Sequence, residues 1–185
     1  MPLESFTPLE SDRLIVRRLE ESDLEALMAV NGDAQVTRYL PYKAWASMDD
    51  AHAWFERMQR IQQDNTALQL VVVEKASNEA IGTCLLFKFD KNNGRCELGY
   101  VMRRSHWGGG YMSEALRAVI GAAFGPLGIR RLDALIDPAN TASARILDRL
   151  GFVQEGLLRE AYVERGGGYS DSAVFGLLRR EWPAV

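Results

Sequence analysis

The chain has 185 residues, of which 47% are apolar and 25% are charged, so it is long enough for one soluble domain with a substantial core. Its net charge of −3 argues against a nucleic-acid binder, which normally presents a basic face, and no apolar run approaches the roughly 20 residues needed to span a bilayer. Residues 1–12 lack the charged and apolar regions of a signal peptide, so we expect a cytoplasmic protein.

The N-terminal segment predicts a strand followed by a helix. Residues 14–19 read LIVRRL, an apolar and β-branched run that is typical of a strand. Residues 20–30 follow as a helix, because Ser22 can serve as its N-cap and Glu25, three residues later, completes a capping box.

Two further helices are expected before the next strand. Residues 33–40 have the length of a short helix that Pro41 ends. Ser47 is the predicted N-cap of a longer helix that runs to about Gln62, with apolar residues along one face. The loop between them carries three aromatic side chains, which suit the lining of a pocket and a packed lid equally well: Tyr39, Tyr42 and Trp45.

Residues 68–75, 80–89 and 95–102 are three predicted strands joined by short turns, which is the pattern of an antiparallel meander. The dipeptide Asn93-Gly94 is a strong signal for a two-residue hairpin turn. A turn centred there pairs Asn92 with Arg95.

The two cysteines are expected to be buried free thiols. In the register set by the Asn93-Gly94 turn, Cys84 lies opposite Arg103, which is seven residues from Cys96. At about 3.3 Å per residue this separation is roughly 20 Å, too long for a disulfide. With two histidines and no close Cys/His spacing, we expect no metal site.

The stretch 100–124 joins a strand to a helix through a basic, glycine-rich turn. From Met112 onward the apolar residues follow the spacing of one buried helical face. Directly before this helix stand Gly108, Gly109 and Gly110, which let the backbone come close to a ligand. Because the positive end of the helix macrodipole adds to their N–H groups, we predict an anion site, most naturally for a phosphate. The alternative is a glycine turn that merely begins a helix.

A short apolar strand at 132–137 is expected beside the strand at 95–102, in a parallel, right-handed crossover. Asn140 is the predicted cap of the next helix, and Gly151 with Phe152 completes a Schellman ending. The turn at 108–113 has neither the GxxxxGK[ST] pattern of a P-loop nor GxGxxG spacing, so the two common nucleotide motifs are excluded.

Two last strands, 153–163 and 169–178, are joined by the turn 165–168. This second run of three glycines leads into a strand, so no helix dipole supports an anion there and a hairpin turn explains it. The predicted fold is one α+β domain over residues 1–185: a mostly antiparallel sheet of about seven strands, with helices on both faces and the parallel crossover described above.

The order of elements, the glycine turn and the segment from Asn140-x-x-Ser143 to Gly151-Phe152 resemble the GNAT N-acetyltransferase superfamily. The segments SDRLIVRRLEESDLEAL and WGGGYMSEAL are similar to its branch of ribosomal-protein N-terminal acetyltransferases, the RimJ/RimL-like enzymes. The resemblance covers roughly residues 10–178.

The resemblance implies an acetyl-CoA site. In this family the strands that correspond to 95–102 and 132–137 splay apart, and the cofactor lies in the gap. The turn amides would hold the pyrophosphate, the strand edge would pair with the pantetheine arm, and the Val101 N–H would face the thioester oxygen. The implied cofactor-binding residues are Tyr100, Val101, Met102, Ser105, Trp107, Gly108, Gly109, Gly110, Tyr111, Met112, Asn140 and Ser143.

The chain departs from the family pattern at two positions. Ser105 stands where the family usually has Gln or Arg, and Leu147 stands where it often has a catalytic tyrosine. The remaining candidates for catalysis are Ser143, as proton donor to the leaving sulfur, and Glu97 or Glu160, as the base that takes a proton from the amine.

These observations predict an acetyl-CoA-dependent N-acetyltransferase acting on a primary amine, with a protein N-terminal α-amine as the expected acceptor. The alternatives are a small-amine acyltransferase and a CoA-binding module without catalysis. The acidic hairpin residues Glu160, Glu164 and Asp171 suit a cationic acceptor or a solvated face. We expect no nucleic-acid or membrane partner, and a monomer or a homodimer.

Overall fold

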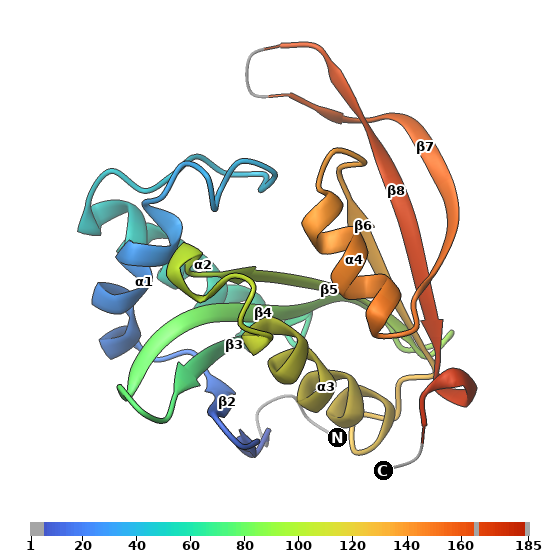
Figure 1. The fold of residues 1–185 in the computed structure, drawn as a ribbon, viewed down its shortest axis with the longest axis horizontal. Helices are drawn as coiled ribbons and strands as arrows, with labels where there is room; N and C mark the ends of the chain where they lie inside the picture. Colours follow the sequence, from blue (N-terminus) through green and yellow to red (C-terminus); the bar gives the residue numbers. More distant parts are fainter. Residues whose placement is uncertain (1–5, 165–166, 184–185) are drawn as a thin grey trace.

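The computed structural model describes residues 6–164 and 167–183, and its centre is one sheet with the strand order β1-β2-β3-β4-β5-β6-β8-β7 (Figure 1). All neighbours are antiparallel except β5 and β6, which are parallel as predicted. The sheet has one strand more than expected because two residues pair ahead of the first predicted strand. The strands are β1 (Leu9–Glu10), β2 (Leu14–Arg18), β3 (Ala67–Glu74), β4 (Glu79–Asp90), β5 (Arg95–Met102), β6 (Arg131–Ile136), β7 (Val153–Val163) and β8 (Tyr169–Leu178).

Helices cover both faces of this sheet, so the prediction of an α+β architecture is confirmed. On one face, α1 (Leu24–Asn31) and α2 (Met48–Gln63) pack with Val71, Val73 and Val101. On the other face, α3 (Tyr111–Phe124) and α4 (Thr141–Arg149) pack over the larger core.

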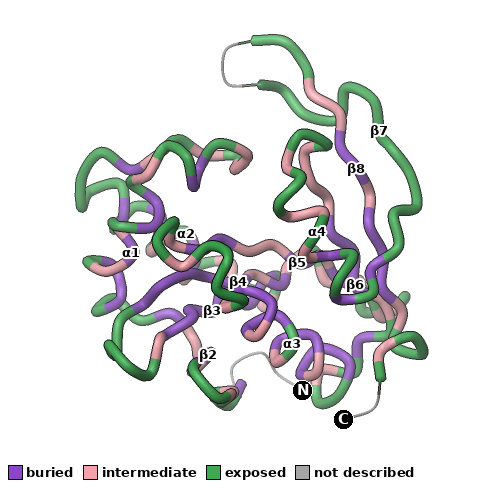
Figure 2. Tube along the Cα trace, in the orientation of Figure 1, coloured by how far each residue is buried: buried purple, intermediate pink, exposed green. Residues whose placement is uncertain are grey.

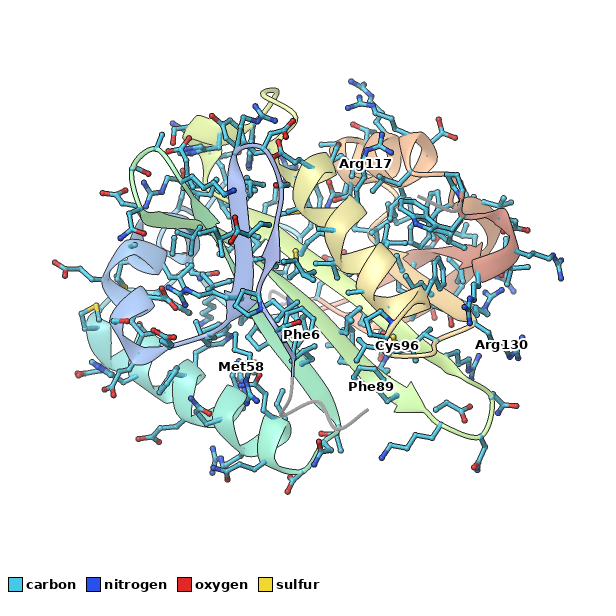
Figure 3. The ribbon with its side chains drawn as sticks, turned by 90° about the horizontal axis from the view of Figure 1, so that it is seen from below. Phe6, Met58, Phe89, Cys96, Arg117 and Arg130 are labelled. Atoms are coloured by element: carbon cyan, nitrogen blue, oxygen red, sulfur yellow. The ribbon has the colours of Figure 1, made fainter. Side chains whose placement is uncertain are left out.

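Figure 3 labels Phe6 and Cys96, two buried members of this larger core, and Arg117, which leaves α3 on its solvent side. The split between the two cores follows from the strand period, because successive residues of a strand face opposite sides of the sheet.

The N-terminal helix is capped differently from the prediction. A short 3₁₀ turn, Glu21–Asp23, precedes α1, and the carboxylate of Asp23 accepts the Glu20 N–H at 2.9 Å. The capping box of Ser22 and Glu25 is therefore wrong. Asp23 takes this capping role in place of Glu25 because its carboxylate is held in position by Arg17. Both terminal nitrogens of Arg17 bind the carboxylate, at 2.8 and 2.7 Å.

Residues 33–40 form a series of turns instead of the predicted helix. The Asp33 side chain accepts the Gln35 N–H at 2.8 Å, and this local bond competes with the helical hydrogen-bond ladder. The helix that follows begins as predicted, since Ser47 and Asp50 form a capping box at the start of α2.

The hairpin between β4 and β5 has a different register from the one predicted. Asp90, not Asn92, pairs with Arg95, because the Asp90 carboxylate binds both the backbone and side-chain nitrogens of Asn93 and closes a longer turn. A bulge between Phe87 and Asp90 then shifts the ladder.

In the observed register Cys84 lies opposite Tyr100, which is four residues from Cys96, about 13 Å along the strand. Both thiols are free and buried, and burial is the main cause that raises the pKa of each to about 12. The prediction of free thiols is confirmed, although the register from which it was argued is wrong.

The C-terminal hairpin has the predicted strand bounds, while residues 165 and 166 of its turn lie outside the described residues. β7 forms the edge of the sheet and is exposed along its whole length (Figure 2). Within the described ranges no helix is long and apolar enough to cross a membrane, and no group of three or more His, Cys, Asp or Glu side chains is placed to hold a metal.

Candidate active site

The two strands at the centre of the sheet separate after three residues of pairing. β5 and β6 are parallel neighbours only at residues 95–97 and 131–133. Beyond these residues β6 follows β8 to Ile136, while β5 stays with β4 to Met102. Residues 98–102 of β5 therefore have one edge without a strand partner.

The backbone groups that face this gap follow from the register of β4 and β5. The Arg103 N–H donates to the Ile81 carbonyl at 2.7 Å, so these two residues form a hydrogen-bonded pair. Because hydrogen-bonded and non-hydrogen-bonded pairs alternate along an antiparallel ladder, the Val101 N–H points toward β4. The N–H groups of Tyr100 and Met102 point into the gap.

This register corrects the oxyanion assignment, because the Val101 N–H does not face the gap. The donors available at the edge are the amides of Tyr100 and Met102. The Met102 carbonyl on the same edge accepts the indole N–H of Trp107 at 2.8 Å, which fixes the turn against the end of the strand.

The glycine turn after β5 leads into the start of α3, where the first backbone N–H groups of a helix have no intrahelical partner. Gly108 and Gly110 have φ angles of 77° and 78°, the left-handed region that glycine adopts without strain. A side chain added at Gly108 would meet no atom within 4 Å, so the space beside it is open to a ligand. Gly110 is the N-cap of α3. The predicted combination of a glycine turn and a helix N-terminus is present.

A cavity of about 530 Å³ lies where this turn, the free edge of β5 and the first turns of α4 meet. Residues 35–40 form a further wall, and the Tyr39 hydroxyl donates to the Ala139 carbonyl at 3.2 Å, which joins this wall to the segment before α4. Among the described residues the lining contains no Asp or Glu, but it contains three arginines, which favour an anion: Arg38, Arg145 and Arg149.

The start of α4 supplies the other polar groups of the cavity. The Asn140 side chain accepts the Ser143 N–H at 3.2 Å, so Asn140 caps the helix as predicted. Both side chains belong to residues that line the cavity. At the far end of α4, the N–H of Phe152 donates to the Leu147 carbonyl at 3.0 Å, as a Schellman ending requires. Leu147 is fully buried in the core and does not reach the cavity.

The Tyr100 side chain brings a second hydroxyl to the same place. Its phenol donates to the Ser143 carbonyl at 3.4 Å, across the gap from β5 to α4. Burial, the largest effect, raises the pKa of this phenol to about 12, so it stays protonated at neutral pH. The sequence had suggested Tyr100 only as a backbone contact.

Most of the predicted cofactor-binding residues meet at this cavity. The predicted residues that line it are Tyr100, Val101, Met102, Trp107, Gly108, Gly110, Tyr111, Met112, Asn140 and Ser143. Ser105 and Gly109 do not line it; the Ser105 hydroxyl lies 3.0 Å from the ring nitrogen Nδ1 of His106 instead.

Neither predicted base lines the cavity. Glu97 is the last residue of β5 that pairs with β6, and its carboxylate binds Lys88 Nζ at 2.7 Å. Glu160 lies on the exposed strand β7, where its N–H donates to the Asp171 carboxylate at 2.9 Å. The choice between them stays a prediction.

The sequence alone did not identify the three arginines or residues 35–40 as part of the site. Arg145 and Arg149 are four residues apart, so a helical reading would have placed them on one face of α4. Of the aromatic residues in the loop, Tyr39 lines the cavity, whereas Trp45 is buried with its ring centroid 5.3 Å from that of Trp54. Tyr39 therefore lines the cavity, as one of the two expectations for this loop had it, while Trp45 packs in the core with α2.

The family model described as an acetyltransferase (GNAT) domain matches residues 13–153. The chain is 34% identical over 174 residues to the uncharacterized N-acetyltransferase p20 of Bacillus licheniformis, a match that covers 94% of this chain and 97% of the relative. It is 28% identical over 183 residues to the [ribosomal protein uS5]-alanine N-acetyltransferase of Escherichia coli, covering 94% and 92%.

Solved structures share the fold. RimL, a ribosomal L7/L12 alpha-N-protein acetyltransferase in complex with coenzyme A, superposes with a TM-score of 0.83 at 22% identity, covering 93% of this chain and 98% of that one. This likeness concerns the fold alone.

Proposed function

Because the chain belongs to the GNAT acetyltransferase family and is therefore an acyltransferase, we propose that it transfers an acetyl group from acetyl-CoA to the N-terminal α-amine of a protein or peptide. The observation that carries the proposal is the shared cavity: the free edge of β5, the glycine turn and the first turn of α4 all border it. An alternative without catalysis has no support, since the relatives named above are N-acetyltransferases.

The residues present fit coenzyme A. The amides of the turn and the positive end of the α3 macrodipole suit a pyrophosphate. Arg145 and Arg149 border the same cavity and add positive charge for the phosphates. The Tyr100 and Met102 backbone groups on the free edge suit the amides of a pantetheine arm, which can pair with them as an added strand.

The thioester of acetyl-CoA supplies the activated acetyl group, and the residues of this chain orient it and hold protons. The Tyr100 and Met102 N–H groups are the available donors toward a carbonyl oxygen in the gap. The hydroxyls of Ser143 and Tyr100 hold protons beside the first turn of α4, where the departing sulfur needs one. The acceptor amine must lose a proton before it attacks, and Glu97, at the closed end of the gap, is the proposed base.

The cavity favours an α-amine over a polyamine. A polyamine carries several positive charges, and a site for it needs carboxylates at close range. Among the described lining residues there are arginines and no carboxylate, and Asp171 on the C-terminal hairpin is already bonded to the Glu160 N–H. The relative that acetylates the alanine of ribosomal protein uS5 supports a protein acceptor.

Release of free thiol from acetyl-CoA tests the function directly. We expect release with peptides that carry a free N-terminal amine and none with the same peptides after N-terminal formylation. Spermidine should give less than about a tenth of the peptide kcat/KM, because desolvating its charges without counter-charges costs at least about 1.4 kcal/mol. Faster turnover of spermidine than of every peptide would replace the proposed acceptor by a small amine.

The glycine turn offers a matched test of cofactor binding. Gly108 and Gly167 both have a positive φ and empty space where a Cβ would stand, so valine imposes similar backbone strain at both. Gly108→Val should raise the dissociation constant of acetyl-CoA at least tenfold, about 1.4 kcal/mol, measured by calorimetry. Gly167→Val, in the hairpin turn, should leave it unchanged. Equal effects of the two variants would show that the glycine turn is not part of the cofactor site.

Two variants separate the proton donors at α4. Ser143→Ala should lower kcat roughly tenfold to a hundredfold with little change in acetyl-CoA affinity, because its hydroxyl helps the sulfur leave. If Tyr100 is the donor instead, Tyr100→Phe lowers kcat and Ser143→Ala does not. If the Ser143 hydroxyl only supports the helix end, Ser143→Ala keeps kcat and loses up to about 1 kcal/mol of unfolding free energy in urea titrations.

Glu97→Gln tests the base. A base at Glu97 predicts a loss of roughly 10²-fold in kcat and of the acidic limb of the pH–rate profile. Lys88→Gln is the control, because it breaks the same ion pair and keeps the carboxylate. Equal losses in both variants would show that the ion pair matters and the base does not. An unchanged pH profile in Glu97→Gln would mean that Glu160 or bulk water accepts the proton of the amine.

A further inference from the structure

Arg13 contacts the glycine turn from far away in the sequence. It stands immediately before β2, and its Nη1 donates to the Gly109 carbonyl at 2.9 Å. Its guanidinium carbon also lies 4.1 Å from the ring centroid of Tyr111, the first residue of α3. The start of the sheet and the start of α3 are thus joined at the turn.

Glu114 holds the Arg13 side chain in one orientation. Its carboxylate accepts Nε and the backbone N–H of Arg13 at 2.7 and 2.9 Å, lies 2.7 Å from Nη2, and accepts the Ser11 hydroxyl at 2.7 Å. Burial alone would raise the pKa of the Glu114 carboxyl, but the bonds from Arg13 and Ser11 lower it below its ordinary value. The carboxylate is therefore charged at neutral pH, and the guanidinium charge is paired.

The bond to the Gly109 carbonyl fixes the direction of the next N–H. A trans peptide is planar, with its C=O and N–H pointing to opposite sides. With the Gly109 carbonyl held toward Arg13, the Gly110 N–H points the other way. The cavity agrees with this geometry, since Gly110 lines it and Gly109 does not. Steric constraints alone do not fix the orientation of a peptide unit between two glycines, because glycine adopts positive and negative φ about equally well.

We propose that Arg13 is a positioning residue for cofactor binding: by holding the Gly109 carbonyl, it keeps the Gly110 N–H directed at the pyrophosphate of coenzyme A. This inference rests on the proposed function. Arg13 acts through the peptide and not by direct contact, because it does not line the cavity and its charge is paired with Glu114. Glu114 has the secondary role of orienting Arg13.

The test compares two ligands that differ in the pyrophosphate. Coenzyme A carries the pyrophosphate within its 3′-phospho-ADP part, whereas S-acetylpantetheine lacks that part and presents the arm and the thioester of acetyl-CoA. Arg13→Ala should raise the dissociation constant of coenzyme A, measured by calorimetry, at least tenfold. The KM of S-acetylpantetheine should change less than about twofold. A general loss of structure would weaken both ligands together, so equal losses would overturn the proposal.

A double-mutant cycle tests the route through Glu114. If Glu114 acts by orienting Arg13, Glu114→Gln should weaken coenzyme A binding in the same selective way, and the double variant should be no weaker than Arg13→Ala alone. Additive losses would contradict this route. Because Glu114→Gln keeps the size of the side chain, it also serves as the test if Arg13→Ala fails to fold.

Arg131→Ala is the matched control. Arg131 has a comparable set of bonds, to Asp133 and Glu155, on a strand away from the turn, so its loss should lower the melting temperature and leave coenzyme A affinity unchanged. Wild-type protein that binds no coenzyme A would overturn the proposed function and this inference together. Wild-type binding with undiminished binding in Arg13→Ala would overturn the inference alone.

Discussion

The unpaired edge of β5 is the constraint on which the rest of the site depends. Backbone N–H and C=O groups inside a protein need partners, and a strand edge in the middle of a sheet leaves a row of them open. β6 cannot supply them beyond residue 97, because it turns away to stay paired with β8 as far as Ile136. The protein thus keeps an opening that an extended, amide-bearing ligand can fill by completing the ladder.

The other parts of the site are arranged around this edge. A short 3₁₀ turn, Arg104–His106, links the end of β5 to the glycine turn, and the Trp107 indole bonds the last carbonyl of the strand. The phosphate end and the extended arm of one ligand would therefore meet surfaces that are continuous along the chain. α4 closes the opposite side, where its capped first turn brings Ser143 within reach of the Tyr100 phenol. In the proposed function, this local interruption of the sheet sets the direction of the ligand, the glycine turn meets its phosphates, and α4 lies beside the candidate proton donors.

The sequence correctly predicted features that depend on interactions between residues close together in the chain. The strand bounds of the C-terminal hairpin, the cap at Ser47 and the Schellman ending after α4 depend on residues within a few positions of one another. The β4–β5 register failed because the Asp90 side chain bonds Asn93 and lengthens the turn, overriding the Asn-Gly preference. The direction of the Val101 N–H was implied by the family resemblance and not by this register; the hydrogen-bonded pair of Arg103 and Ile81 places it toward β4 instead. The contact between Arg13 and Gly109 spans 96 positions and has no local signal at all.

The two runs of three glycines show why composition alone does not define a site. Gly108 and Gly167 share a positive φ and open space, so as isolated backbone they are nearly equivalent. What distinguishes Gly108 is its surroundings: the N-terminus of α3 adds a partial positive charge, and arginines border the space in front of it. The carbonyl of the next residue is held by Arg13. Near Gly167 the chain enters β8, where backbone dipoles alternate and largely cancel. The proposed anion site thus depends on the helix, the cations and the anchored peptide together, and the glycines contribute the room for a ligand to reach them.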